Sequence, residues 1–411
     1  MIHGCIGEKL GHSFSKEIHA KIADYKYELC EIEKQNLDVF MQTRDFKAIN
    51  VTIPYKQAVI PHLHYISDTA KKIGAVNTIV NKDGKLYGYN TDFYGMSRLI
   101  SKAGINFGDK CVLICGSGGT SKTAYAVAES LGAKKIIKAS RSEKDGFVTY
   151  HQLKNLKDEI EIIINTTPAG MFPNSDTTCV DVSDFKNLCG VIDAVYNPLT
   201  TRLVREARNL GIKAECGLYM LVAQAVRASE IFLDTEYPDE IYDNIYNEIL
   251  SSKRSVVLVG MPGCGKSTIG KILAEETGKE FFDSDEEIIK QTGTAPSDII
   301  KKHGEAYFRD IESSIIKELS DKNGVIIATG GGAVLRSENV TNLKKNGILV
   351  FLDRDISTIV PTLDRPLSCD ADKLKKLYDL RYPIYTSVAD VIIKSTDSPE
   401  TTAEAVRRET E

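Results

Sequence analysis

Two glycine-rich loops, each lying between an expected strand and an expected helix, constrain this chain more than any other feature of its sequence. The first loop follows the apolar run 110–115, and the second follows the apolar run 255–259. Short, continuous apolar runs are typical of strands that are buried on both faces of a parallel sheet. A buried strand, a glycine loop and a helix in succession form the frame of a nucleotide-binding α/β unit. The sequence therefore predicts two such units in series.

Each loop is followed by residues with the spacing of a buried helix face, closed by a glycine. After the first loop, apolar residues recur before Gly132 at i, i+3, i+4 and i+7: Ala124, Val127, Ala128 and Leu131. After the second loop, a similar stripe precedes Gly278: Ile269, Ile272 and Leu273. Glycine often ends a helix because it readily adopts the left-handed conformation found there. We expect one helix after each loop.

At 411 residues, the chain is long enough for two or three domains. A polar stretch, 247–254, follows an expected helix over 240–250, and we place a junction there. About one hundred residues of a different, mixed pattern precede the first loop, and we interpret them as a substrate-binding lobe. A helix from Asp92 to Gly104 is expected to join this lobe to the first nucleotide-binding unit.

Composition excludes several classes of protein. The 57 acidic and 52 basic residues leave a net charge of −5, which does not favour nucleic acid or an anionic membrane as a partner. No apolar run approaches the roughly 18 residues of a membrane span, and the first residues lack the pattern of a signal peptide. Nine cysteines without a CxxC pair, and seven histidines without an HExxH array, indicate a reducing compartment and no structural zinc. We expect a cytoplasmic protein.

The second loop, GMPGCGKST, matches the phosphate-binding pattern GxxxxGK[ST] in full. Its glycines let backbone N–H groups curl around phosphates, Lys266 reaches the terminal phosphates, and the Ser267 hydroxyl coordinates Mg²⁺. The loop residues expected at the nucleotide are Gly263, Gly265, Lys266, Ser267 and Thr268. The motif predicts a nucleotide and Mg²⁺ as ligands but says nothing about the acceptor.

Acidic and basic residues beyond this loop indicate where an acceptor would bind. Asp283 and Asp285 follow an expected strand over 280–282, at the carboxyl edge of the sheet, although they could instead cap a helix starting at Glu286. Arg309 lies on the next expected helix, beside a buried face formed by Phe308, Ile311, Ile315 and Leu319.

The charged neighbours of Arg309 leave two interpretations. Glu305 at i−4 and Glu312 at i+3 can orient its guanidinium, although a surface ion pair is the more common meaning of such a triplet. A third strand, 325–329, then runs directly into three glycines: Gly330, Gly331 and Gly332. Successive glycines allow a ligand to approach the backbone very closely.

From Val256 to near its end, the chain resembles the shikimate kinase family. The family's motifs occur in order: the P-loop, DxD at 283–285, FRxxE at 308–312, GGG at 330–332, DRPL at 364–367 and RY at 381–382. The resemblance implies that Asp285 holds the shikimate hydroxyls and assists proton loss, and that Arg309 and Arg381 bind the carboxylate. It also implies that Arg365, in the family's lid, stabilises the transferring phosphoryl group. No separate aspartate ends the third strand, so Mg²⁺ is assigned to Ser267 and Asp283.

The first loop, GSGG at 116–119, is close to the dinucleotide pattern GxGxxG but lacks its third glycine. The next strand, 135–139, ends in Ser140, Arg141 and Ser142, with Lys144 close behind. An NAD site would carry an acidic residue there, whereas a cation and two hydroxyls suit a 2′-phosphate. The strand end therefore favours NADP over NAD.

Lys56 and Asp92 are candidates for proton transfer. A ketone reductase needs a proton donor beside the carbonyl oxygen, and a lysine paired with a carboxylate can supply it. A solvated surface lysine and a helix N-cap are the ordinary alternatives for these two residues.

Over roughly residues 1–245 the chain resembles the shikimate dehydrogenase family. The matching motifs are GHSFS at 11–15, NVTIPYK at 50–56, GAVNT at 74–78, GYNTD at 88–92, NTTPAGM at 165–171, DAVYNP at 193–198 and GLYMLVAQ at 217–224. The resemblance implies that Lys56 and Asp92 are the catalytic pair. It implies substrate contacts from Ser13, Ser15, Thr52, Asn77, Tyr196, Gly217 and Gln224. It implies NADP contacts from Gly116, Gly118, Gly119, Ser140, Arg141 and Thr166. Lys16 stands where the family usually has proline, and serines flank Arg141 where it more often has Asn and Thr.

Together the two halves predict a bifunctional α/β enzyme of aromatic amino-acid biosynthesis. Residues 1–250 form a two-lobed dehydrogenase with a Rossmann-like NADP domain, its substrate lobe covering 1–97 and 217–250 and its cofactor lobe 98–216. Residues 251–411 form a P-loop kinase domain of the nucleoside-monophosphate-kinase type. We expect NADPH-dependent reduction of 3-dehydroshikimate to shikimate, then phosphorylation of shikimate with Mg²⁺ and ATP.

Two alternatives concern the first half. It could be a quinate/shikimate dehydrogenase that prefers NAD, or a non-catalytic NADP-binding module that regulates the kinase. The expected partners are small-molecule substrates, and an oligomer could form through the dehydrogenase half.

Overall fold

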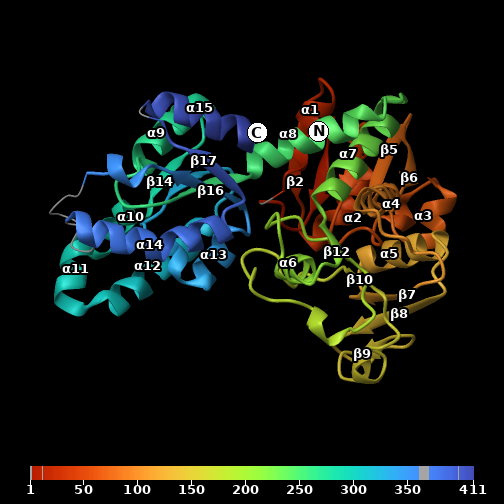
Figure 1. Cartoon of the computed structure of the whole chain (residues 1–411). Coiled ribbons are helices and arrows are strands. Elements are labelled where there is room, and N and C mark those ends of the chain that lie inside the picture. Colours follow the sequence, from red (N-terminus) through yellow and green to blue (C-terminus); the bar gives the residue numbers. More distant parts are fainter. Residues whose placement is uncertain (1, 12, 361–369, 397) are drawn as a thin grey trace. The chain divides into compact units, whose positions relative to one another are not determined.

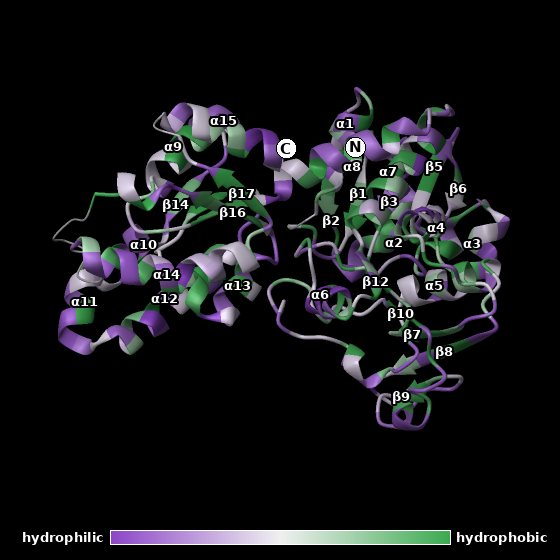
Figure 2. Ribbon diagram, viewed as in Figure 1, coloured by the Kyte–Doolittle hydropathy of each residue, from purple (hydrophilic) through white to green (hydrophobic). Residues whose placement is uncertain are grey.

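The computed structural model describes residues 2–11, 13–360, 370–396 and 398–411 (Figure 1). Its contacts divide the chain into two compact units, residues 1–249 and 250–411. Both units consist of sheets and helices, which confirms the predicted α/β class. Hydrophobic residues concentrate in the sheets, and hydrophilic residues lie along helices such as α11 (Pro296–His303) and α14 (Ala371–Val388) (Figure 2).

The first sheet of unit 1 has the strand order β2-β1-β3-β5-β6-β4. Its strands are β1 (His3–Gly7), β2 (Tyr27–Glu31), β3 (Ala48–Val51), β4 (Tyr65–Ile66), β5 (Thr78–Lys82) and β6 (Lys85–Tyr89). β5 pairs antiparallel with β3 and β6, and the other pairs in this sheet are parallel. The helices that accompany it are α1 (Ser15–Ile22), α2 (Leu37–Thr43), α3 (Asp68–Ile73), α4 (Asp92–Ala103), α7 (Leu218–Leu233) and α8 (Glu240–Lys253).

The second sheet of unit 1 is parallel throughout, in the order β12-β11-β10-β7-β8-β9. Its strands are β7 (Cys111–Cys115), β8 (Lys135–Ser140), β9 (Val148–Thr149), β10 (Ile162–Asn165), β11 (Gly190–Asp193) and β12 (Lys213–Cys216), with helices α5 (Gly119–Ser130) and α6 (Arg202–Asn209). All residues of β7, β10 and β11 are buried, as their continuous apolar runs predict. Because the strands are parallel, the loops after β7, β10 and β11 leave the same edge of the sheet.

Unit 2 contains one parallel sheet in the order β14-β15-β13-β16-β17. Its strands are β13 (Ser255–Val259), β14 (Phe281–Asp283), β15 (Ile326–Ala328), β16 (Gly347–Asp353) and β17 (Val391–Lys394). Its remaining helices are α9 (Lys266–Thr277), α10 (Ser284–Thr292), α12 (Glu305–Ser320), α13 (Ser337–Leu343) and α15 (Pro399–Thr410). The central strand β13 carries the P-loop, so the candidate phosphate site lies at the middle of the sheet's carboxyl edge.

Several expected boundaries were wrong by a few residues. α5 ends at Ser130, so Leu131 leaves the helical face and is 38% exposed. α10 starts at Ser284 rather than Glu286, because Asp283 caps it by accepting from the backbone N–H of Asp285.

The polar stretch expected to form the junction is helical. α8 continues through it to Lys253, two residues before β13 begins. Tyr242, Ile245 and Ile249 form its buried stripe, at i, i+3 and i+7. Within this stretch Asn247 and Glu248 are exposed, whereas residues 250–254 are half-buried. No helix in the described parts of the chain is long and apolar enough to cross a membrane.

Two candidate active sites

Lys56 and Asp92 form a buried ion pair in unit 1. The Nζ of Lys56 donates to Oδ2 of Asp92 over 2.5 Å, and the two side chains are 13% and 9% exposed. Asp92 is the first residue of α4, whereas Lys56 lies in the loop after β3. The ordinary alternatives are wrong, because Lys56 is not solvated and Thr91, not Asp92, is the N-cap residue. An ammonium group held in this way can donate a proton to an oxygen beside it.

A buried polar network connects this pair to two predicted substrate residues. The Thr91 N–H donates to Oδ1 of Asn77 over 2.7 Å, and Nδ2 of Asn77 donates to Oγ1 of Thr91 over 3.1 Å. The same hydroxyl lies 3.4 Å from Oε1 of Gln224, on α7. Sequence reasoning assigned no role to Thr91, although its place directly before Asp92 was a usable signal.

Tyr196 lies beside the segment that carries the two predicted serines. Oγ of Ser13 donates to Oγ of Ser15 over 3.0 Å. Tyr196 follows β11, and its ring centroid lies 5.2 Å from that of Phe14, between the serines. Burial raises the pKa of Tyr196 to about 12, so its phenol remains a neutral hydrogen-bond donor. Thr52, directly after β3, is half-buried.

The glycine loop after β7 lies against the ion pair. Gly116 has a φ of +115°, and a Cβ there would lie 2.5 Å from Oγ1 of Thr166, so only glycine fits. A Cβ at Gly118 would meet no described atom within 4 Å, whereas one at Gly119 would lie 3.6 Å from Cδ of Lys56. The open side of this loop and the N-terminus of α5 are therefore next to Lys56, where a nicotinamide and a ketone would have to meet.

Gly217 is explained by packing. It is the N-cap residue of α7, and a Cβ there would lie 2.3 Å from the carbonyl oxygen of Ala194. Its N–H donates to the Val195 carbonyl over 2.9 Å, so it supports the loop that carries Tyr196. Its predicted substrate contact stays a prediction.

The end of β8 presents a free cation. Ser140 is the last residue of β8, and its hydroxyl donates to the Ser142 carbonyl. Arg141 is exposed, and no acidic side chain among the described residues pairs with it. An unpaired guanidinium at this edge suits an anionic ligand such as a 2′-phosphate.

In unit 2, the P-loop is held in a shape that requires glycine. Gly263 and Gly265 have φ values of +82° and +97°. Lys266 is the first residue of α9, and its buried Nζ donates to the carbonyls of Gly260 and Met261 over 3.0 and 2.9 Å. Thr268 borders a cleft of about 80 Å³ whose other residues include Gly265, Arg354 and Pro399.

Ser267 and Asp283 provide adjacent oxygen ligands for a cation. Oγ of Ser267, on α9, donates over 2.5 Å to Oδ2 of Asp283, the last residue of β14. A hydroxyl and a carboxylate at this distance fit Mg²⁺, which prefers oxygen ligands and keeps several waters. Among the described residues no group of three or more His, Cys, Asp or Glu side chains could hold a metal. Mg²⁺ would therefore depend on the phosphates as well.

Asp285 and Glu312 each have an unpaired carboxylate oxygen beside Gly330. Oδ1 of Asp285 and Oε1 of Glu312 are buried and have no hydrogen-bond partner among the described residues. A Cβ at Gly330 would lie 3.0 and 2.6 Å from these two atoms. Burial, together with the charges of Asp283 and Glu312, raises the pKa of Asp285 to about 6. A carboxylate with this pKa can accept a proton from an attacking hydroxyl near neutral pH.

Arg309 is part of the same buried cluster. Its side chain is 10% exposed; it donates to Glu312 over 2.6 Å and to Glu305 over 2.8 Å. The surface ion-pair alternative is therefore wrong. A Cβ at Gly332 would lie 2.1 Å from Nη2 of Arg309, so this glycine makes room for the guanidinium.

The structure adds a second reason for the run of three glycines. A Cβ at Gly331 would lie 2.8 Å from Cδ of Pro262, in the P-loop, and the Gly331 carbonyl accepts from the Tyr385 hydroxyl. A side chain at any of the three glycines would therefore clash with the protein's own atoms, whether or not a ligand also approaches the backbone there.

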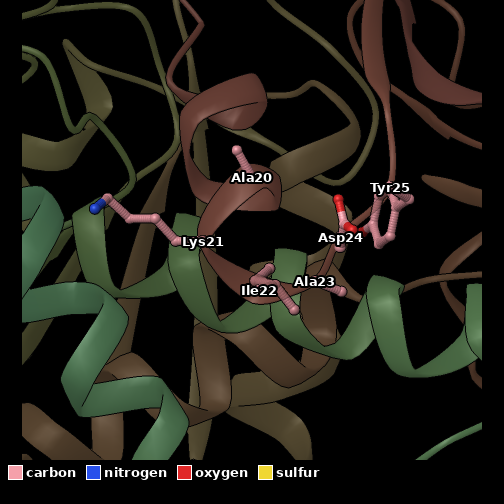
Figure 3. Close-up of a pocket in the computed structure, with 6 residues that line it drawn as sticks. All are labelled: Ala20, Lys21, Ile22, Ala23, Asp24 and Tyr25. Carbon is pink, nitrogen blue, oxygen red and sulfur yellow. The ribbon is translucent and has the colours of Figure 1, made fainter.

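Arg381, on α14, completes the cation pair predicted for a carboxylate. It is 3% exposed, its Nε has no partner among the described residues, and burial lowers its pKa. Arg365 lies outside the described residues, so its role stays a prediction. A separate surface hollow of about 330 Å³ is lined by residues 20–25 at the end of α1, and no predicted site residue lines it (Figure 3).

Comparison with known proteins assigns each half to a family. The family model described as the shikimate dehydrogenase substrate binding domain matches residues 5–79, and that described as shikimate kinase matches residues 262–411. The shikimate dehydrogenase (NADP(+)) of Clostridium perfringens is 38% identical over 266 residues, which cover 60% of this chain and 98% of that protein.

Two solved structures resemble the chain over the same extent. Shikimate dehydrogenase 1 of Peptoclostridium difficile is 38% identical, with a TM-score of 0.57, and covers 60% of this chain and 97% of its own. The Thermus thermophilus shikimate 5-dehydrogenase in complex with NADP(H) and shikimate is 25% identical, with a TM-score of 0.55, and covers 60% and 99%. The chain belongs to the shikimate dehydrogenase family, as an enzyme of the shikimate pathway, and carries a shikimate kinase domain at residues 262–411.

Proposed function

We propose that this chain catalyses two consecutive reactions. Unit 1 reduces 3-dehydroshikimate to shikimate with NADPH, and unit 2 phosphorylates shikimate with ATP and Mg²⁺ to shikimate 3-phosphate. The observation that carries the first reaction is the buried Lys56–Asp92 pair beside the glycine loop. The supporting observation for the second is the Asp285–Arg309–Arg381 cluster, next to a complete P-loop.

In the first reaction, Lys56 donates the proton. NADPH, when bound along the loop 116–119, supplies the hydride to the carbonyl carbon. Lys56 protonates the oxygen, which would otherwise become an alkoxide, and Asp92 keeps the ammonium directed at it. Ser13, Ser15 and Tyr196 would bind the substrate carboxylate and hydroxyls through neutral hydrogen bonds.

In the second reaction, unit 2 orients shikimate by its two ends. Arg309 and Arg381 bind the carboxylate, and Asp285 accepts the proton of the hydroxyl that attacks ATP. Lys266 leaves its loop carbonyls for the terminal phosphates. Mg²⁺, when bound at Ser267 and Asp283, offsets phosphate charge.

A nicotinamide assay without ATP tests the proposal. The intact chain is incubated with shikimate and either NADP⁺ or NAD⁺, and nicotinamide reduction is followed by absorbance. Rapid reduction with NADP⁺ alone is expected. Nicotinamide reduction with NAD⁺ as the cofactor, and with quinate in place of shikimate, would support the quinate/shikimate alternative. No reduction with either cofactor, from a chain that still phosphorylates shikimate, would leave a kinase with a regulatory binding module.

Arg141→Ser is expected to raise the KM for NADPH by about ten- to a hundredfold and to change the KM for NADH little. The free guanidinium of Arg141 would pair with the 2′-phosphate, which NADH lacks, and charge-assisted bonds of this kind are the strong ones. Steady-state kinetics with each cofactor give the KM for NADPH and the KM for NADH, and thus the ratio of the two. Equal losses for the two cofactors would contradict phosphate recognition by Arg141.

Asp285→Asn is expected to abolish phosphorylation and yet stabilise unit 2. The folded state raises the pKa of Asp285 from 3.8 to about 6, so ionisation at higher pH costs folding free energy. Removing the charge should raise the free energy of unfolding by about 1–3 kcal/mol above pH 6. The gain should shrink as the pH falls from 6 toward 3.8, the ordinary pKa of Asp285, because the folded and unfolded states then both bind the proton.

Urea unfolding of the full chain at two pH values measures this gain. The exposed Asp298, on α11, provides the control Asp298→Asn, which should change neither activity nor stability. A stability loss in Asp285→Asn at pH 8 would contradict the burial argument.

A further inference from the structure

Asp193 is a fully buried carboxylate that no step above uses. It is the last residue of β11 and has no exposed surface. Its Oδ1 accepts from Nδ2 of Asn165 over 2.9 Å and from the N–H of Val195 over 3.0 Å, and its Oδ2 accepts from Oγ1 of Thr201 over 2.8 Å. A buried carboxylate with three donors aimed at it is an organising centre for the segments that provide them.

One of these donors connects Asp193 to the turn after β10. Asn165 and Asp193 are paired across the parallel strands β10 and β11. The Asn165 amide also donates to the Ala169 carbonyl over 3.2 Å, and its Oδ1 accepts from the N–H and hydroxyl of Thr167. A single side chain thus ties Asp193 to the whole turn 165–169.

The two segments that meet at Asp193 lead to the two ligands of unit 1. The turn after β10 contains Thr166, whose hydroxyl fills the space beside Gly116 in the cofactor loop. The turn after β11 contains Val195, whose N–H donates to Asp193, and continues into Tyr196 against Phe14. The distance between the hydride donor and the ketone therefore depends on how these turns are placed relative to each other.

We propose that Asp193 is a positioning residue for hydride transfer: through Asn165, Val195 and Thr201 it holds the cofactor turn and the substrate turn in one fixed relation. This inference rests on the dehydrogenase activity proposed for unit 1. Asp193 has no exposed surface through which to touch a ligand, and it acts by hydrogen bonding rather than by its charge.

The surroundings of Asp193 explain why its charge is dispensable. Burial raises its pKa to about 7, and the titratable groups that interact with it are the thiols of Cys216, on β12, and Cys179, in the loop before residues 182–184. The Thr201 hydroxyl lies 3.8 Å from Sγ of Cys216. When position 193 carries a proton or an amide, Thr201 can turn its hydrogen to that sulfur and accept instead. All three contacts then survive.

Two substitutions at this position separate hydrogen bonding from charge. Asp193→Ala leaves the three donors unpaired, so kcat for shikimate oxidation should fall by about ten- to a hundredfold, with a higher KM for both shikimate and NADP⁺. Asp193→Asn keeps the contacts and should restore kcat to within about threefold of the parent. Its pH–rate profile should superimpose on that of the parent between about pH 6 and 8.

The control is Asp181→Ala, which removes an exposed carboxylate that accepts from Ser183 in the same unit. It should leave all these constants unchanged. Shikimate phosphorylation by unit 2 of the same chain measures the amount of enzyme, and urea unfolding gives the folded fraction. A merely structural role for Asp193 would lower the amount of folded enzyme without changing either KM.

Each outcome decides the proposal. Parental kinetics in a folded Asp193→Ala, or a large loss in Asp193→Asn, would overturn it, the latter because it would show that the charge matters. If Asp193→Ala does not fold, the variants Thr201→Val and Thr201→Ser test the proposal instead. Thr201→Val should raise the KM for both shikimate and NADP⁺, whereas Thr201→Ser should not. Equal KM values in these two variants would overturn the proposal. Absence of shikimate oxidation in the parent would instead refute the proposed function.

Discussion

Lys56→Ala is expected to lower kcat for shikimate oxidation by about 10²- to 10⁴-fold, the usual contribution of a positioned general acid or base. The Nζ of Lys56 donates to Asp92, and the stem of the same side chain lies against the cofactor loop at Gly119. Without it, proton transfer depends on water, which this site largely excludes, since both side chains are nearly buried. The loss should fall on kcat more than on the KM for NADP⁺, because the glycine loop is unchanged.

The control for this experiment is Lys85→Ala, which removes an exposed lysine from β6 of the same unit. It should leave both activities unchanged. Phosphorylation by Lys56→Ala should equal that of the parent, because Lys56 belongs to unit 1 and the P-loop to unit 2. Survival of normal shikimate oxidation in Lys56→Ala would refute the proposed mechanism of unit 1.

Lys266→Ala is expected to reduce shikimate phosphorylation by at least about a hundredfold and to leave shikimate oxidation intact. In the structure, Nζ of Lys266 is buried against the carbonyls of Gly260 and Met261, at the mouth of the P-loop. It is the cation of the P-loop itself, and removing one such donor typically costs 10²- to 10³-fold in rate. An assay coupled to ADP formation measures the loss of phosphorylation rate.

Lys271→Ala provides a matched control on the same helix. Lys271 is exposed and forms a 3.6 Å ion pair with Glu286, so its loss should have little effect. Loss of both activities in Lys266→Ala would show that the two units are obligately coupled, contrary to the division of the chain into separate compact units.

Local pattern was sufficient for the elements that carry the glycine loops. The apolar run after Arg254 predicted β13 with its observed bounds, and the helix from Asp92 to Gly104 agrees with α4. Errors arose where local pattern is ambiguous. Leu131 follows the helical spacing of α5 by number, but the helix stops one residue before it. The helix expected over 240–250 continues to Lys253, so the division between the two units, after residue 249, falls within α8.

The candidate sites, like the secondary structure, could be predicted only in part from local sequence pattern. The P-loop and the strand-end residues could be predicted because parallel strands bring their carboxyl ends to one edge of a sheet. The Arg309 triplet could not be resolved from spacing, because i−4 and i+3 neighbours occur on exposed and buried helices alike. Burial of Arg309 follows from the glycine at position 332, whose missing Cβ leaves space for the guanidinium.

By itself the sequence determined the class of the fold, the order of the two nucleotide-binding units and the residue types available at each strand end. These depend on short-range spacing, which fixes strand, loop and helix in succession. Family resemblance had already joined Lys56 with Asp92 and Ser267 with Asp283, but only the tertiary structure gave their distances and burial. Tertiary structure alone showed that Asp193 meets Asn165 and Thr201. Such pairs join segments distant in the chain, and their geometry depends on how sheets and helices pack, which no local pattern encodes.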